Sequence, residues 1–229
     1  MKRMITLAVL SIFIALGANA QYRGGMGNYQ RVYPTRRTVG HYYGAGWNRP
    51  YFGLRIGPTF STVNSDDAML DGGNMKTGVD VGIAGGFPLS GFLPLYFETG
   101  LYYVEKGGKG NYSGNRFTYN MDYLELPFVF KYIVDINGDF AIHPYLGGYA
   151  SLGVAGKIKN FGTRQAYSSF GDSDYSFRRG DAGIKIGCGF SYDMLYAELN
   201  YDWGLANISH NYFGDARNSA ITLNVGINF

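Results

Sequence analysis

The last nine residues of the chain alternate strictly between apolar side chains and polar or small ones. The apolar positions are Ile221, Leu223, Val225, Ile227 and Phe229. A period of two is the period of a β-strand, whose successive side chains point to opposite faces. The segment therefore predicts a strand with one face in an apolar environment and the other face in a polar one.

A strongly apolar strand at the end of a chain has two interpretations. It is an edge strand of a soluble sandwich, or it closes an outer-membrane β-barrel and resembles the signal that the bacterial barrel-assembly machinery reads. The two interpretations differ in what they require of the rest of the sequence. A barrel requires export, interfacial aromatic residues and, in bacteria, an even number of strands.

The N-terminal residues predict export. Lys2 and Arg3 are followed by an apolar run from Ile5 to Leu16 and by a small-x-small sequence at residues 18–20. These are the three parts of a secretory signal peptide, which we assign to residues 1–20. The apolar run is too short to span a membrane as a helix. We expect the exported protein to carry no helical membrane anchor.

The composition favours a small barrel over a soluble sandwich. The chain of 229 residues contains 35 Gly, 21 Tyr and 16 Phe but only 7 Pro. A small barrel needs Gly where its interior is crowded and amphipathic rings at the two membrane–water interfaces. The single Cys188 excludes an internal disulfide.

Residues 21–50 differ in charge from the remainder of the chain. This segment carries Arg23, Arg31, Arg36, Arg37 and Arg49 and no acidic residue, whereas residues 51–229 carry 13 basic and 17 acidic side chains. Its Gly and aromatic residues show no periodicity, so it cannot bury enough apolar area to fold alone. We expect a flexible basic tail over residues 21–50, able to bind a partner, and a barrel domain over residues 51–229.

Eight segments of that domain alternate with the period of a strand. Their apolar positions share one face, and their charged and Gly positions share the other. The predicted strands are residues 52–60, 78–87, 95–103, 124–132, 145–157, 182–190, 195–203 and 221–229.

The connectors between these segments are alternately long and short, beginning and ending with a long one. The short connectors contain turn sequences such as Ser90-Gly91 and Asn137-Gly138. Bacterial barrels have short periplasmic turns and long outer loops, so an even strand number leaves both termini in the periplasm. We therefore expect an all-β protein, an eight-stranded antiparallel transmembrane β-barrel located in the cell outer membrane.

The face opposite the apolar one carries charges of both signs. Side chains fill the interior of an eight-stranded barrel, and charges buried there must be paired or hydrated. We expect an interior charge network that plugs the barrel; a proton or ion pathway is the alternative. The members of this network are Arg55, Asp80, Glu98, Glu125, Lys131, Lys185, Glu198 and Asp202.

Catalysis in a barrel would require a nucleophile, a base and an orienting acid close together. Ser209 and His210 adjoin and Asp215 is near, but adjacent residues of a strand point to opposite faces. His41 and His143 are too far apart in the sequence to indicate a metal site. We expect no enzymatic activity, no metal and no cofactor.

Three segments carry a resemblance to known barrels. They are YLELPFVFKY at residues 123–132, GLRIGPTFS at residues 53–61 and HPYLGGYASLG at residues 143–153. The first resembles the YLEIP…KY element of the small Bacteroidetes barrel family that includes PorT and PorG. The second is similar to the opening strand of that family and the third to its central PY-x-G-G strand. The resemblance covers residues 51–229 and implies an outer-membrane barrel without known catalysis.

Two members of that family are accessory proteins of the type IX secretion system, and one of them associates with the periplasmic ring of that machine. The resemblance thus favours a non-enzymatic anchor or scaffold for periplasmic machinery, with type IX protein secretion as the leading system. The expected partners are outer-membrane lipid, the barrel-assembly machinery and a periplasmic protein such as a secretion-ring component, but no nucleic acid.

Two alternative functions stay open. One is an OmpA- or OmpX-like surface barrel that serves adhesion or envelope integrity through its outer loops. The other is a narrow solute channel, against which the charged and crowded interior argues.

Overall fold

The computed structural model describes residues 49–66, 74–91, 93–112, 115–137, 139–159, 166–171, 176–210 and 214–229. The predicted signal peptide lies outside the described residues, as does the basic tail apart from Arg49 and Pro50. Within the described part of the chain, no helix has the length and apolar character needed to cross a membrane.

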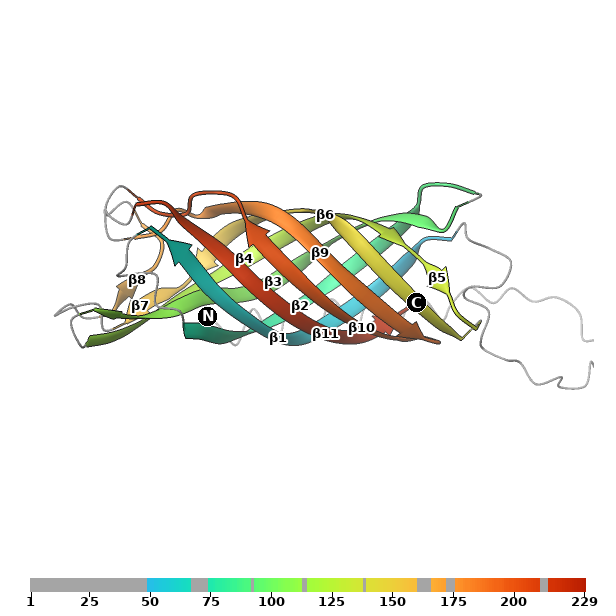
Figure 1. Cartoon of the computed structure of the whole chain (residues 1–229), viewed down its shortest axis with the longest axis horizontal. Helices are drawn as coiled ribbons and strands as arrows, with labels where there is room; N and C mark the ends of the chain where they lie inside the picture. The colour runs from blue at the N-terminus through green and yellow to red at the C-terminus, as the bar shows by residue number, and fades with distance from the viewer. Residues whose placement is uncertain are drawn as a thin grey trace, which may run out of the picture. The chain divides into compact units, whose positions relative to one another are not determined.

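Eight long strands form one closed antiparallel barrel, around which they run obliquely (Figure 1). Consecutive long strands are paired, and β1 pairs with the last strand and closes the barrel. The eight-stranded antiparallel barrel predicted from the sequence is confirmed. The long strands are β1 (Tyr51–Ser65), β2 (Asn74–Pro88), β3 (Leu95–Tyr112), β4 (Asn115–Tyr132), β6 (Phe140–Ala155), β9 (Gly180–Tyr192), β10 (Leu195–Gly204) and β11 (Ala216–Asn228).

Three short strands extend the sheet at its two ends. β5 (Val134–Asp135) pairs with β6, β7 (Lys157–Lys159) pairs with β4, and β8 (Tyr167–Ser168) pairs with β7. The alternation pattern did not predict them because segments of two or three residues are too short to show a period.

The long connector expected between residues 103 and 124 is mostly strand. β3 and β4 have 18 residues each, and their pairing continues to Tyr112 opposite Asn115. The sequence between Glu105 and Asn120 is polar and rich in Gly, so the apolar alternation stops there. The hydrogen-bond ladder needs no apolar side chains and continues without them, which is why the predicted strand ends were wrong.

The outward faces of the eight strands form an apolar surface. Ile56, Leu146 and Trp203 are each more than half exposed, at 55%, 55% and 56%. Contiguous apolar exposure of this kind is unusual in a soluble monomer and is expected of a surface that faces lipid. Four of the predicted assembly residues, Ile221, Leu223, Val225 and Ile227, lie on the outward face of β11, and the fifth, Phe229, follows the strand and is exposed.

Inward-facing glycines leave space for tyrosine rings. A Cβ atom on Gly187 would lie 2.5 Å from the ring of Tyr145, and one on Gly82 would lie 2.5 Å from the ring of Tyr102. Both tyrosines are buried. Because real Cβ atoms do not approach so closely, the interior accepts each ring only where the paired residue on the neighbouring strand lacks a side chain.

The first and last strands meet at one end of the barrel. The amide of Phe229 donates to the carbonyl oxygen of Phe52 at 2.8 Å, and the amide of Phe52 donates to the carbonyl oxygen of Phe229 at 3.2 Å. This end, which we call the turn end, also carries the connections from β2 to β3 and from β9 to β10. The opposite end, where β7 and β8 lie, is called the loop end (Figure 1).

Candidate functional site

The structure places all eight residues of the predicted interior network inside the barrel. Their side chains come from six strands and are buried, with relative exposures between 0% and 7%. They do not form one continuous network. They divide into a group toward the loop end, a group toward the turn end, and a pair of carboxylates between the two groups.

The group toward the loop end is a closed ring of four charges. The Nζ atom of Lys106 lies 2.7 Å from Glu125 and 3.0 Å from Asp202. The Nζ atom of Lys185 lies 2.9 Å from Glu125 and 2.6 Å from Asp202. We call these four residues the charge ring. Each charge has two neighbours of opposite sign, so the ring is neutral and every strand that contributes to it, namely β3, β4, β9 and β10, is tied to two others.

The group toward the turn end combines charges with tyrosines. Lys131 Nζ donates to Glu98 at 2.7 Å and to the hydroxyl of Tyr196 at 2.8 Å. The hydroxyl of Tyr51 donates to the same carboxylate oxygen of Glu98. The Arg55 guanidinium lies 3.8 Å above the centre of the Tyr196 ring, which is cation–π geometry. We call these five residues the tyrosine network.

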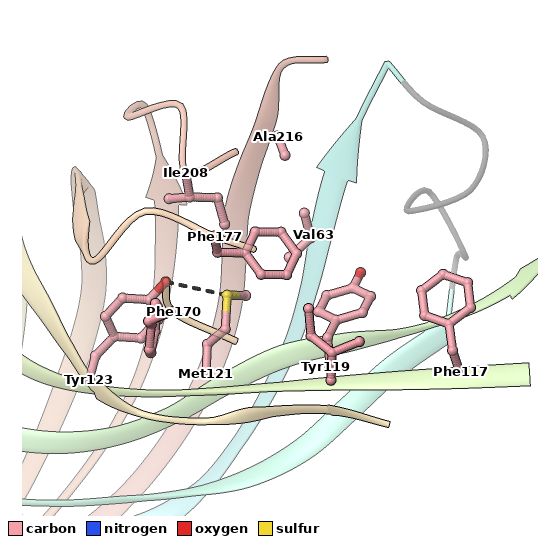
Figure 2. Packing of buried hydrophobic residues seen from close by; sticks show 10 residues of the cluster. Val63, Phe117, Tyr119, Met121, Tyr123, Phe170, Phe177, Ile208 and Ala216 are labelled. Carbon is pink, nitrogen blue, oxygen red and sulfur yellow. Dashed lines mark hydrogen bonds between the residues drawn. The ribbon is translucent and has the colours of Figure 1, made fainter. Parts of the chain in front are cut away.

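Two apolar clusters lie on either side of these charges, one at each end of the barrel. At the loop end, Phe177 and Ile208, which lie outside the long strands, pack with residues of β1, β4 and β11 (Figure 2). Figure 2 also shows the hydroxyl of Tyr123 donating to the sulfur of Met121, at 3.4 Å. We call this cluster the loop-end cap; its members are Val63, Phe117, Tyr119, Met121, Tyr123, Ile158, Phe170, Phe177, Ile208 and Ala216. At the turn end, Tyr51, Tyr96, Ile133 and Ala141 form the second cluster.

The most important residue that the sequence did not indicate is Lys106. The predicted strand ended at Tyr103, although Lys106 continues the inward phase set by Glu98 and Tyr102. Extending that alternation by three residues would have found it. His143, which the sequence left beside a turn, lies inside the barrel, where its Nε2 atom is 2.8 Å from the hydroxyl of Ser191.

The candidate nucleophile Ser209 is not aligned with a base. Its hydroxyl donates to the backbone carbonyl oxygen of His210 at 3.0 Å and contacts that of Gly214. Asp215 accepts from the side-chain amide of Asn207 at 2.7 Å. Within the described ranges, no group of three or more His, Cys, Asp or Glu side chains is arranged to hold a metal ion.

Of the predicted partner-binding arginines, only Arg49 is among the described residues, where it is exposed. Arg23, Arg31, Arg36 and Arg37 lie outside them.

Residues 29–210 match the protein family described as outer membrane protein beta-barrel domain. The chain belongs to this family. Its membership and its closed eight-stranded fold locate it in the outer membrane. The narrower resemblance to the PorT and PorG group stays a prediction. No curated protein is significantly similar to the chain in sequence.

Solved outer-membrane barrels are similar at low sequence identity. The attachment invasion locus protein Ail of Yersinia pestis is 15% identical over 79% of this chain and 99% of its own, with a TM-score of 0.42. Neisserial surface protein A is 14% identical over 78% of this chain and 97% of its own, with a TM-score of 0.48. The N-terminal barrel domain of Pseudomonas aeruginosa OprF is 13% identical over 77% and 97%, with a TM-score of 0.36.

In this outer-membrane barrel, the apolar surface faces lipid and the polar outer parts of β3 and β4 extend beyond it. Among the described residues, those that contact solution therefore lie at the two ends of the barrel.

Proposed function

We propose that this outer-membrane barrel is a non-enzymatic anchor that holds its basic segment, residues 21–50, for a partner in the periplasm. The type IX secretion system is the leading candidate for the machinery it serves, because of the resemblance of residues 123–132 to the PorT and PorG group.

The observation that carries the proposal is the filled interior. The charge ring and the Lys131–Glu98 pair fill the interior, and an apolar cluster lies beyond them at each end. An eight-stranded barrel packed in this way has no wide path for solutes. This argues against a solute channel. The proposed function therefore depends on the parts of the protein that contact solution.

The point at which the basic segment joins the barrel supports a periplasmic partner. The segment joins the barrel at β1, whose first residues lie at the turn end. Bacterial barrels have their short turns in the periplasm, and we infer that a segment attached at the turn end extends into the periplasm. Arginine is suited to such a role because its planar guanidinium forms two parallel hydrogen bonds with a carboxylate and stacks on aromatic rings.

A replacement of the segment tests the proposal. Residues 23–48 are exchanged for a Gly/Ser sequence of equal length, which keeps the signal peptide, the spacing and the barrel. Proteins bound to the variant and to the wild type are crosslinked in intact cells, co-purified and identified. We expect equal barrel abundance and loss of a periplasmic partner, together with loss of cargo secretion if the type IX assignment holds.

Charge reversal tests the role of the arginines more specifically. The double substitution Arg36→Glu and Arg37→Glu keeps the length and aromatic content of the segment, and we expect a weaker form of the same defect. Recovery of the same partners by both variants would contradict the proposal.

A second candidate is an OmpA- or OmpX-like surface barrel. The loop-end cap favours it, because Phe170 and Phe177 hold parts of the connector between β6 and β9 at a defined place on the barrel. An ordered outer surface of this kind can present a fixed binding face. Loss of adhesion or of envelope integrity on replacing residues 160–165 and 172–175 by Gly/Ser, with the basic segment intact, would support this alternative.

A further inference from the structure

Three buried carboxylates of the described interior have no ion-pair partner. One of them, Asp181, accepts hydrogen bonds from Tyr149 and Asn218, and the other two lie close together. Asp80 and Glu198, which are 3% and 5% exposed, lie between the charge ring and the tyrosine network. Among the described residues, no side-chain nitrogen of Lys, Arg or His lies within 4.0 Å of either carboxylate. A buried carboxylate without a counter-charge is costly, so the pair needs a compensating charge from another source.

Neutral groups provide the hydrogen bonds that these carboxylates receive. The amide nitrogen of Asn224 donates to Asp80 at 3.0 Å and to Glu198 at 3.3 Å, so one side chain bridges both carboxylates. The hydroxyls of Tyr145 and Tyr196 both donate to the second oxygen of Glu198, each at 3.1 Å. These donors orient the carboxylates but do not cancel their charge.

A small cavity adjoins both carboxylates. Its volume is about 20 Å³, which accommodates one occupant the size of a water molecule. Asp80, Glu198 and Asn200 are among its lining residues. The Oδ1 atoms of Asp80 and Asn200 are buried and have no hydrogen-bond partner, and the two side chains belong to residues only 3% and 4% exposed. The cavity therefore has oxygen atoms available to an occupant.

The nearby cations are already engaged. Lys185 lines the same cavity but is bound to Glu125 and Asp202 in the charge ring. Arg55 donates to Asn228 at 2.6 Å and stacks on a tyrosine ring. Over the described interior as a whole, five buried Lys and Arg side chains face six buried Asp and Glu side chains. The five are Arg55, Lys76, Lys106, Lys131 and Lys185, and the six are Asp80, Glu98, Glu125, Asp181, Glu198 and Asp202.

We propose that this cavity binds one small monovalent cation, for which Na⁺ is the probe, with oxygen ligands from Asp80, Glu198 and Asn200. Hard cations bind carboxylate and amide oxygens, and a single positive charge balances the excess carboxylate. The site joins β2 and β10, which are separated in the sheet by β1 and β11. Its role is to complete the packed interior, so the ion is a structural ligand and is not transported.

The ion enters during folding. Because the cavity lies between the two apolar clusters, exchange in the folded barrel is slow. The test therefore refolds the purified full-length protein from urea into detergent micelles. Matched series contain either NaCl or N-methyl-D-glucamine chloride at equal ionic strength, and the urea midpoint of unfolding is measured in each.

The expected result is a higher urea midpoint in Na⁺, rising with the logarithm of the Na⁺ concentration, as for any ligand that binds only the folded state. Asp80→Asn removes the excess charge and abolishes the difference between the two cations. Glu105→Gln changes a partly exposed carboxylate on the outward side of β3 and leaves the difference intact. If Asp80→Asn does not fold, Asn200→Ala replaces it and reduces the difference.

Two results would overturn the proposal. A wild-type midpoint that is the same in Na⁺ and in N-methyl-D-glucamine excludes a bound cation. A urea midpoint that rises on acidification but is the same with either cation shows that Asp80 and Glu198 share a proton instead. Sodium that stays with the folded wild type after gel filtration into sodium-free buffer, and is lost in Asp80→Asn, is a second readout that does not depend on stability.

Discussion

Lys106 and Lys185 bind the same two carboxylates, those of Glu125 and Asp202, from strands β3 and β9. Each lysine is paired with both acids, and the four distances from Nζ to a carboxylate oxygen lie between 2.6 and 3.0 Å. The ring couples four strands through their side chains, in addition to the backbone ladder.

Removing one charge from the ring should destabilise the barrel more than removing two of opposite sign. Lys106→Met leaves two carboxylates with one lysine, and we expect a loss of about 3–5 kcal/mol in the free energy of unfolding. Lys106→Met combined with Glu125→Gln leaves the neutral Lys185–Asp202 pair, so the double variant should lose less than the single one. Urea unfolding in micelles measures both, and strictly additive losses would indicate a hydrated interior.

The spaces opposite the tyrosines should not accept a methyl group. Gly187→Ala places a Cβ atom against the Tyr145 ring and should reduce the free energy of unfolding by about 1–3 kcal/mol. Gly180→Ala is the matched control on the same strand, because nothing lies within 4 Å of its added Cβ atom. Equal urea midpoints for the two variants would show that the tyrosine moves freely.

A charge on the lipid face of β11 should impair insertion. Val225 is 55% exposed on the apolar surface, and Val225→Asp should cost about 1–3 kcal/mol near the bilayer midplane. Arg217→Asp is the control on the same strand beyond that surface. Deletion of Phe229 removes both backbone hydrogen bonds to Phe52 and should also reduce folded yield. Heat-modifiable migration of outer-membrane extracts measures the yield, and normal yields would contradict the assigned face.

The purified barrel should not conduct ions steadily. The loop-end cap and the turn-end cluster lie on either side of paired charges, so planar bilayers containing the protein should show no stable single-channel current. Phe177→Ala removes a ring from the loop-end cap only and should not create such a current. A stable, ion-selective current through the wild type would restore the channel interpretation.

The strand faces could be predicted from the sequence because burial in this protein follows the period of a strand. Arg55, Glu98 and Glu125 occupy the inward phase that the alternation indicated. The strand lengths could not be predicted, because β3 and β4 continue through polar residues beyond the apolar surface.

The pairing of the interior charges was also beyond sequence reasoning. Lys106 contacts Glu125 on the neighbouring strand β4, but it also contacts Asp202 on β10, across the interior. That second contact depends on the closure and stagger of the barrel, which local alternation does not encode.

Position-specific photo-crosslinking in intact cells tests the central claim, that the segment before β1 binds a periplasmic partner. A photoreactive amino acid replaces Tyr42 in the basic segment or, as the matched position, Tyr167 in β8 at the loop end. We expect an adduct with a periplasmic protein from position 42 and no such adduct from position 167. Adducts from position 167 alone, with none from position 42, would contradict it.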